Sequence, residues 1–407
     1  MQIRHVVWLL TLSLIAAMFC AIAPRAAWHQ TLVERYRPVL HANTLIENHY
    51  VRAVDAQQLN DGALRGLMDA LDPYSAYLTA DQMKTYEEQL AGKLVGVGVE
   101  VAITTDDQIV LTPLPGGPAE LAGIEAGDRL IAIDNASTRD LTVFAINSRL
   151  AGAPESRVLL TIERSEESAP QQFHVERARF ESDSVRGHVK KEDGWHWLID
   201  EDRQIAHIKI ADFGESMIDQ FDEAMTQCMR DGAKALILDL RNNPGGLVTQ
   251  AIQLVDRFVG ESDLPILTIQ AQQGALTKYS AEDSGTNFKI ALAVLINRYS
   301  ASAAEIVAGS LQDHERATII GEQSFGKGSV QYVRELEGGG AVRFTSAYYR
   351  LPKGRVVHRA LHERDHTQWG ILPDMTVSNV ASGDGVEDPQ LSEAIEWLSK
   401  KLNATGP

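Results

Sequence analysis

A serine-containing segment after an apolar run holds the densest set of reactive side chains. Asn297–Glu305 directly follows the apolar stretch that ends at Ile296. This order predicts a strand, a sharp turn and a helix. A serine hydroxyl at such a turn lies near backbone N–H groups and the helix dipole, which stabilise a developing oxyanion. The alternative interpretation is that Ser300 or Ser302 only caps the helix.

A serine nucleophile needs a base, and Lys327 is the candidate because no histidine occupies a comparable turn. Gly326 and Gly328 flank it and let the backbone pack closely against another element. Burial lowers the pKa of a lysine, so that the neutral amine becomes available. Gln331 is four residues further on and would face the same side of an extended strand, where it could orient the amine.

The segment Asp239–Gly246 ends a predicted buried strand with two glycines. Such a Gly-Gly pair can present backbone N–H groups to an anionic oxygen. The alternative is a tight turn before the helix predicted from Val248.

Two other motifs would indicate a different function if they were complete. Gly321–Gly328 nearly matches the nucleotide-binding P-loop, but a glycine stands where the magnesium-binding Ser or Thr is required. His362–His366 is a formal HExxH, extended by His358, but charged residues fill its centre and no third ligand is evident. We therefore predict no nucleotide, no catalytic metal and no cofactor.

The elements around these segments indicate several domains. Leu32–Leu90 has helical spacing and breaks at Asp72-Pro73, and Thr79 is a plausible helix cap. From Leu94 to Val101 apolar residues alternate, which predicts a strand in a compact α+β module. Further on, strands alternate with helices, which argues for a sheet covered by helices. The strands are Ile205–Ile210, Ala235–Asp239, Ile266–Gln270 and Ile290–Ile296, and the helices Met217–Met229, Val248–Phe258 and Ser302–Asp313.

Composition narrows the function classes. The 407 residues carry a net charge of −17, which repels phosphate backbones, so nucleic acid is not expected as a partner. The two cysteines are Cys20 and Cys228, and only the second lies in the folded body. This excludes an internal disulfide framework and any CxxC site.

The N-terminal run Val6–Ala23 has no formal charge and follows Arg4 and His5. Its length is at the lower limit for a membrane span. Pro24 directly follows the small-residue pattern Ala21-Ile22-Ala23, which disfavours cleavage. We expect an uncleaved signal anchor in preference to a cleaved signal, and either would export the body.

Taken together and in order, these segments resemble the carboxyl-terminal processing peptidases, or tail-specific proteases. Leu71–Leu78 looks like the family's N-terminal signature, and Gly96–Val99 with Gly117–Asp128 like its PDZ domain. Asp239–Gly246, Ser300–Asp313 and Phe325–Gln331 look like its catalytic core, and Gly370–Asp374 and Asp388–Leu391 like its C-terminal signatures.

The resemblance implies a multidomain α+β fold with an N-terminal helical segment, a PDZ domain and an α/β protease core with a ClpP/crotonase-like sheet. The expected boundaries are 1–23 for the anchor, 24–91 for the helical region, 92–166 for the PDZ domain, 172–380 for the peptidase core and 381–407 for a C-terminal helix. Two departures are Ala304, in place of the usual third serine, and a polar insertion between Arg355 and Trp369.

The family's nucleophile falls on Ser302, its general base on Lys327 and the lysine's partner on Gln331. Its oxyanion donors fall on the backbone N–H groups of Gly246 and Ala303. PDZ domains bind a peptide tail by strand addition and capture its carboxylate with backbone N–H groups. The candidate capture loop here is Gly96, Val97, Gly98 and Val99.

The implied function is a serine endopeptidase that recognises and cleaves near the C-termini of proteins in the cell envelope. Its partners would be substrates with apolar C-terminal tails, the inner membrane through Val6–Ala23, and an adaptor or activator protein, with oligomers possible. The alternative is a catalytically inactive PDZ peptide-binding protein anchored at the membrane. Loss of Ser302 or Lys327 would mark it, and both are present.

Overall fold

The computed structural model describes residues 34–404 apart from positions 92, 104–107, 115–116, 126, 140, 142, 165–168, 182, 192–193, 261, 283–286, 360–368 and 379–387. The chain divides into two compact units, Met1–Tyr77 and Leu78–Pro407. The expected anchor Val6–Ala23 and the HExxH residues His362–His366 lie outside the described residues. Within the described part, no helix has the length and apolar character needed to cross a membrane.

The first unit is mainly helical, with one helix over residues 34–49 and a second, α2 (Ala56–Asp69). Asp55 caps α2, because its carboxylate accepts a hydrogen bond from the N–H of Gln57. The strand β1 (Ala76–Leu78) begins at the end of this unit. The helical prediction for this region is therefore correct in type but covers separate helices rather than one.

The second unit opens with α3 (Ala80–Leu90), which starts where the sequence predicts. Thr79 and Gln82 form a reciprocal cap: Thr79 Oγ1 accepts from the Gln82 N–H at 3.3 Å, and Gln82 Oε1 accepts from the Thr79 N–H at 3.0 Å. The strand predicted over Leu94–Val101 is split in two, because Gly98 has a left-handed φ of 72° that bends the chain there.

Residues 97–176 form what we call the small domain. Its antiparallel sheet has the order β3-β4-β5-β7-β8, with β6 beside β5. Its buried cluster is apolar and includes Val97, Leu111, Ile146 and Leu160. The pair β2–β9 joins the chain segments that enter and leave this domain. The elements are β2 (Lys93–Gly96), β3 (Val99–Ile103), β4 (Ile109–Pro113), α4 (Pro118–Leu121), β5 (Arg129–Ile133), β6 (Ala136–Ser137), α5 (Val143–Leu150), β7 (Arg157–Glu163), β8 (Gln171–Glu176) and β9 (Ala178–Glu181).

Residues 184–404 form the core domain, built around a seven-stranded sheet in the order β10-β14-β15-β18-β19-β22, with β13 beside β14. The pairs β14–β15, β15–β18, β18–β19 and β19–β22 are parallel. These strands are β10 (Val185–Arg186), β13 (Leu198–Asp200), β14 (Ile205–Ile210), β15 (Ala235–Asp239), β18 (Ala291–Ile296), β19 (Thr318–Gly321) and β22 (Met375–Thr376).

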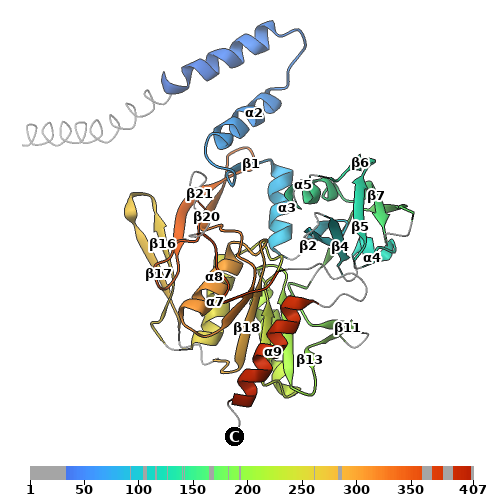
Figure 1. The fold of residues 1–407 in the computed structure, drawn as a ribbon. Coiled ribbons are helices and arrows are strands. Elements are labelled where there is room, and N and C mark those ends of the chain that lie inside the picture. The colour runs from blue at the N-terminus through green and yellow to red at the C-terminus, as the bar shows by residue number, and fades with distance from the viewer. Residues whose placement is uncertain are drawn as a thin grey trace, which may run out of the picture. The chain divides into compact units, whose positions relative to one another are not determined.

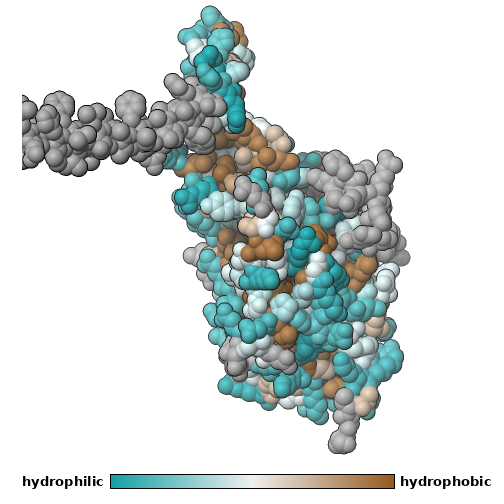
Figure 2. All heavy atoms as spheres, turned by 90° about the vertical axis from the view of Figure 1, so that its left-hand side faces the viewer, coloured by the Kyte–Doolittle hydropathy of each residue, from teal (hydrophilic) through white to brown (hydrophobic). Residues whose placement is uncertain are grey.

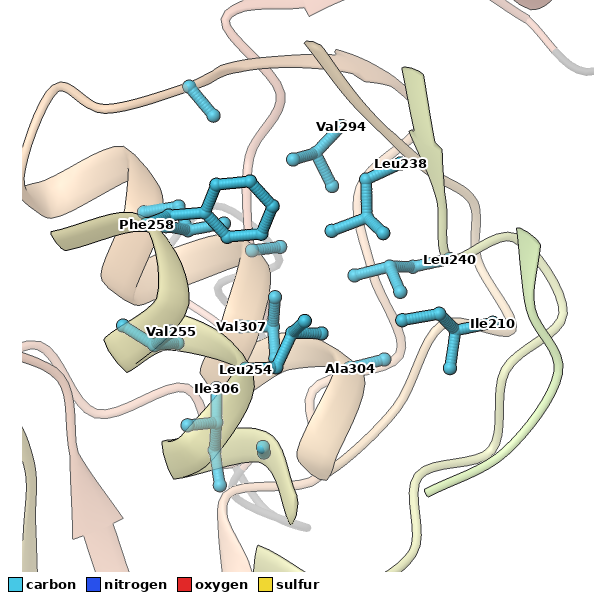
Figure 3. Close-up of a cluster of buried hydrophobic side chains, with 14 of the residues drawn as sticks. Ile210, Leu238, Leu240, Leu254, Val255, Phe258, Val294, Ala304, Ile306 and Val307 are labelled. Atoms are coloured by element: carbon cyan, nitrogen blue, oxygen red, sulfur yellow. The ribbon is translucent and has the colours of Figure 1, made fainter. Parts of the chain in front are cut away.

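The two faces of this sheet are covered by different helices (Figure 1). Alternate strand residues such as Leu236 and Leu238 pack against α6 (Met217–Arg230), α7 (Val248–Val259) and α8 (Ala303–Asp313). Figure 3 shows this layer, with Phe258 of α7 and Val307 of α8 directed towards the strand side chains. The intervening residues Ala235 and Ile237 pack against α9 (Pro389–Ala404). Burial on both faces explains the continuous apolar strands in the sequence.

A second sheet contains a strand that the sequence analysis assigned to the first. In it β21 pairs with β20 and β16, and β16 pairs with β17, all antiparallel. The predicted strand Ile266–Gln270 lies in β16, outside the helix-covered sheet, because an apolar run does not specify which sheet it joins. The elements are β16 (Pro265–Ala271), η1 (Gln272–Gly274), β17 (Leu276–Ser280), β20 (Ser329–Glu335) and β21 (Ala341–Arg350), and a separate hairpin consists of β11 (Val189–Lys191) and β12 (Gly194–His196).

Candidate active site

The segment between β18 and α8, which we call the serine turn (residues 297–302), separates the roles of its two serines. Ser300 is fully buried, and its hydroxyl donates to the carbonyl of Leu240 at 2.8 Å and accepts from the N–H of Asn297 at 3.0 Å. Ser302 is partly exposed and has a φ of 55° and ψ of −114°. A non-glycine residue in this conformation is strained, and such strain occurs where a strand-to-helix turn holds a nucleophile.

Glu305 organises the site from the first turn of α8. Its carboxylate is fully buried and accepts four hydrogen bonds. The N–H groups of Ser302 and Lys327 both donate to Oε2 at 2.8 Å. Ser324 Oγ and the N–H of Gly326 donate to Oε1 at 2.5 and 2.7 Å. The pKa of this carboxyl is raised above its usual value, because the effect of burial outweighs that of the four donors, which lower it. One carboxylate therefore joins the backbone at Ser302 to the backbone at Lys327.

Tyr349 makes a second link between the same two residues. Its buried hydroxyl lies 3.2 Å from the carbonyl oxygen of Ser302 and 3.1 Å from that of Lys327. Burial, together with the charge of Glu305, raises the pKa of Tyr349 well above its usual value, so the phenol stays a neutral donor. The backbones of the two candidate catalytic residues are thus held together by the carboxyl group of Glu305 and the phenol of Tyr349.

Lys327 lies in the loop before β20, in surroundings that disfavour its charge. Burial lowers the pKa of the Lys327 amine, and the charge of Arg343 lowers it further, against the opposing charge of Glu305. The glycines beside it allow this packing: Gly326 has a φ of 87°, and a Cβ on Gly328 would stand 2.5 Å from the backbone nitrogen of His358.

Gln331 does not share a strand with Lys327, so the prediction that both side chains face the same side of one strand is wrong. Lys327 precedes β20, and a register shift between Val330 and Gln331 interrupts the ladder. The Gln331 amide group donates to Ser329 Oγ at 3.1 Å and Thr345 Oγ1 at 3.0 Å. Its Oε1 is buried and has no hydrogen-bond partner among the described residues.

The segment after β15, which we call the glycine turn (residues 240–246), lies directly against the serine turn. A Cβ on Gly245 would stand 2.7 Å from Ser302 Cβ and 3.0 Å from the nitrogen of Ala303. A Cβ on Gly246 would stand 2.5 Å from the carbonyl oxygen of Phe213. Only glycine fits either position, since both also have positive φ. No described residue accepts a hydrogen bond from the N–H of Gly246 or of Ala303.

Asparagines hold the two turns in register. Asn297 Oδ1 accepts from the N–H of Asn242 at 3.0 Å, and Asn297 Nδ2 donates back to Asn242 Oδ1 at 2.8 Å. The N–H of Ala301 donates to the carbonyl of Asn243 at 2.9 Å. Both loops therefore present their backbones as one preorganised unit.

The proposed tail-binding loop is mostly built into the small domain. The carbonyl of Val97 accepts from the N–H of Ala119 at 2.7 Å, that of Gly98 accepts from Leu114 at 2.9 Å, and the Val97 side chain is buried. Gly96 ends β2, and Val99 begins β3 opposite Pro113. Among the described residues, the N–H groups of Val97 and Gly98 have no acceptor.

Three contributors to the site escaped the sequence analysis: the Glu305 carboxylate, the Tyr349 hydroxyl and the Asn242–Asn297 pair. A signal existed for Glu305, because an acidic residue three positions after a serine at a helix start is a capping-box pattern. No comparable signal exists for Tyr349, which is 47 residues from Ser302 along the chain.

Family comparisons match all three regions of the chain. A model of peptidase family S41 matches residues 204–377, a PDZ domain model matches residues 109–164, and a model of the activating protease CtpB N-terminal domain matches residues 22–82. The matches follow the order of the helical unit, the small domain and the core domain.

Individual relatives agree with these matches. The carboxy-terminal-processing protease of Bartonella bacilliformis is 34% identical over 332 residues, which cover 82% of this chain and 72% of that protein. The carboxyl-terminal-processing protease of Picosynechococcus sp. is 32% identical over 345 residues, covering 83% and 78%. The solved photosystem II D1 C-terminal processing protease superposes with a TM-score of 0.57 at 26% identity, covering 88% and 90%. The chain therefore belongs to the carboxyl-terminal processing protease family, peptidase family S41, and is a serine-type peptidase.

Proposed function

We propose that this peptidase cleaves proteins near their C-termini with Ser302 as nucleophile and Lys327 as general base. The observation that carries the proposal is the buried Glu305 carboxylate, which binds the backbone N–H groups of both residues at 2.8 Å. A carboxylate shared in this way holds the nucleophile and base in one geometry, which is what covalent catalysis by a serine requires.

The reaction follows from these positions. The neutral Lys327 amine takes the proton of the Ser302 hydroxyl as its oxygen attacks the scissile carbonyl. The tetrahedral oxyanion lies between the N–H groups of Gly246 and Ala303, which are unoccupied by other described groups. The Lys327 ammonium then protonates the leaving amine, and water hydrolyses the acyl enzyme by the same proton transfers in reverse.

Gln331 orients the lysine in this scheme. Its buried Oε1 lacks a partner among the described residues and is the kind of acceptor that an amine N–H binds. Because Gln331 carries no proton in the reaction, Gln331→Ala should reduce turnover less than Ser302→Ala or Lys327→Ala.

The pH profile tests the base. A group whose neutral form is active gains activity as pH rises through its pKa, and burial lowers that pKa for Lys327. We therefore expect kcat/KM on a peptide substrate to rise with pH and level off below the usual lysine range. A profile that is flat from acid to base would contradict this role.

Substrate recognition falls to the small domain and to apolar surface near the site. We assign capture of a C-terminal carboxylate to Gly96, Val97, Gly98 and Val99, since the N–H groups of Val97 and Gly98 lack acceptors among the described residues. Phe325 is 43% exposed, and its N–H donates to the carbonyl of Ser300, so an apolar side chain lies beside the serine turn.

The exposed surface of the second sheet supports an apolar substrate preference as well. Figure 2 shows hydrophobic residues among hydrophilic ones on the face that carries β16, β17, β20 and β21. Tyr332 and Tyr348 of this sheet are each 46% exposed. Apolar surface of this kind suits the side chains of an extended, apolar tail.

Export to the cell envelope and anchoring in the inner membrane by Val6–Ala23 belong to the same proposal, with envelope proteins as substrates. An adaptor that presents them is compatible with it. Fractionation tests the anchor: the full chain should sediment with membranes, whereas a chain that begins after Pro24 should be soluble.

Cleavage of an unstructured protein with an apolar C-terminal tail tests the central proposal. The full chain should cut it, and Ser302→Ala should lose activity by about 10⁴-fold or more while its circular dichroism stays unchanged. Ser300→Ala is the matched control for nucleophile identity. Cutting by Ser302→Ala would refute the assigned nucleophile, and binding of the tail without cutting by the wild type would favour the inactive PDZ alternative.

A further inference from the structure

Arg241, in the glycine turn, forms a buried ion network outside the residues that touch the reaction. Its side chain is 12% exposed. Nε and Nη2 donate to the carboxylate of Asp239, with Nη2 at 2.6 Å from Oδ2. Nη1 donates to both carboxylate oxygens of Asp388, at 2.7 and 2.9 Å. The guanidinium therefore joins two carboxylates from parts of the chain 149 residues apart.

Asp388 stands at the start of α9. Its Oδ1 also accepts from the N–H of Leu391 at 3.0 Å, so the same carboxylate caps the helix and binds Arg241. The α9 helix packs on the sheet face opposite α7 and α8, with Ala394 and Leu398 buried against Ile237 and Leu295. The Arg241–Asp388 pair thus reaches from the glycine turn to the layer behind the sheet.

The other attachments of the glycine turn run elsewhere. Asn242 binds Asn297, and the carbonyl of Leu240 accepts from Ser300, so these bonds lead to the serine turn. On the other side, the N–H of Phe213 donates to the carbonyl of Gly245 at 3.0 Å, which ties this end of the turn to the chain after β14. Within the described residues, the side-chain hydrogen bonds from this turn to α9 and its cap all come from Arg241, including one to Gln390 at 3.3 Å. Arg241 therefore connects the glycine turn to α9, which covers the sheet face opposite α8 and the serine turn.

We propose that Arg241 and Asp388 are a positioning pair for the oxyanion site, through which α9 sets the location of the Gly246 N–H. This inference rests on the proposed function. Oxyanion donors act on the transition state more than on bound substrate, so misplacing one lowers kcat and leaves KM nearly unchanged. Two N–H donors at fixed positions tolerate little displacement, since about 1 Å can cost about 10²-fold in rate.

Asp388→Asn isolates the charge. Asparagine has the same shape and still caps a helix, and Arg241 keeps its bonds to Asp239, so the fold should persist. We expect kcat to fall about tenfold or more with KM within twofold of the wild type. The affinity for a peptide boronic acid, whose serine adduct fills the oxyanion site, should fall in parallel. Arg241→Lys, which loses the two-pronged geometry, should act in the same direction.

Asp222→Asn is the matched control. Asp222 pairs with Arg257 at 2.9 Å, another partly buried ion pair between two elements, and neither residue touches the glycine turn. If ion-pair loss only destabilised the fold, both variants would lower the melting temperature and leave kcat per folded molecule unchanged. Asp388→Glu, which keeps the charge, should recover part of the lost kcat.

The outcomes separate the two proposals. An unchanged kcat and boronate affinity in Asp388→Asn and Arg241→Lys, with an active wild type, would overturn the positioning role alone. If Asp388→Asn does not fold, Arg241→Lys and Asp388→Glu decide it by the same two readouts. A wild type that neither cuts the substrate nor binds the boronate would overturn the proposed function, and this inference with it.

Discussion

The surroundings of the serine and glycine turns in the core domain differ from the interior of the small domain. Near the serine and glycine turns the core buries Asp239, Asn243, Asn297, Ser300 and Glu305, each at most 2% exposed. In the small domain the buried cluster is apolar, and Asp128 and Thr138 are the buried polar side chains among its described residues. Buried polar groups stabilise a fold only when they are fully hydrogen-bonded. A fully bonded network is also rigid, which suits a region where a reaction needs fixed geometry. The tail binding that we propose for the small domain would occur by strand addition, which needs only an available backbone.

Gly245→Ala, in the core domain, should lower activity more than the other variants described below. The new Cβ would stand 2.7 Å from Ser302 Cβ and 2.9 Å from the carbonyl oxygen of Ala301, so the two turns must separate. We expect kcat to fall by about 10²–10³-fold, as for loss of an oxyanion donor. Gly274→Ala is the control, since Gly274 has a similar positive φ of 79° and open space around it. Equal losses in both variants would assign the effect to backbone strain.

Glu305→Gln should have a smaller but clear effect on the same side. Its amide NH₂ would face donors, leaving at least one buried N–H without an acceptor, which costs about 1–3 kcal/mol of stability. We expect kcat to fall about 10- to 100-fold because Ser302 and Lys327 lose their shared acceptor. Glu163→Gln, which weakens a 2.8 Å ion pair with Arg129 in the small domain, should keep kcat near wild type. Steady-state kinetics and thermal unfolding of both variants compare their kcat values and their stabilities.

Gly98→Ala should probe the small domain with the smallest effect. Its Cβ would stand 2.9 Å from the Phe180 ring and 3.1 Å from Gly117 Cα, at a φ of 72°. We expect KM for a tail-bearing protein to rise several-fold, because the capture loop shifts while the core is untouched. Hydrolysis of a short chromogenic peptide ester without a tail should stay at the wild-type rate. A fall in ester hydrolysis would mean that the small domain shapes the catalytic geometry itself.

Much of the fold could be predicted from the sequence because its signals are local. Continuous apolar runs identified β14, β15 and β18, and spacing identified α6, α7 and α8. The PDZ and core regions followed from ordered motifs, which the family matches confirm. The assignment of β16 to the helix-covered sheet was wrong, since its partners β17 and β21 are set by long-range pairing.

The residues of the candidate site also fall into those that local sequence predicts and those that depend on long-range contacts. Residue type and spacing pointed to the Ser300–Ser302 turn, Lys327 and the Gly245–Gly246 pair, because glycine and a serine at a helix start have conformational signatures in the chain itself. The choice of Ser302 over Ser300 came from the family resemblance. The strand argument for Gln331 failed because the lysine precedes β20 and the ladder shifts at Gln331.

The sequence by itself determined which residues could react and which elements would carry them, since periodicity, glycine and capping preferences act over a few residues. Only the tertiary structure decided that Ser300 is structural, that Glu305 joins Ser302 to Lys327, and that Arg241 reaches Asp388. Apart from the local Ser302–Glu305 bond, these contacts link residues 22 to 147 positions apart, and their geometry depends on how whole layers pack. The ion pair of Arg241 with Asp388 forms only once the layers have packed, so no local sequence pattern predicts it.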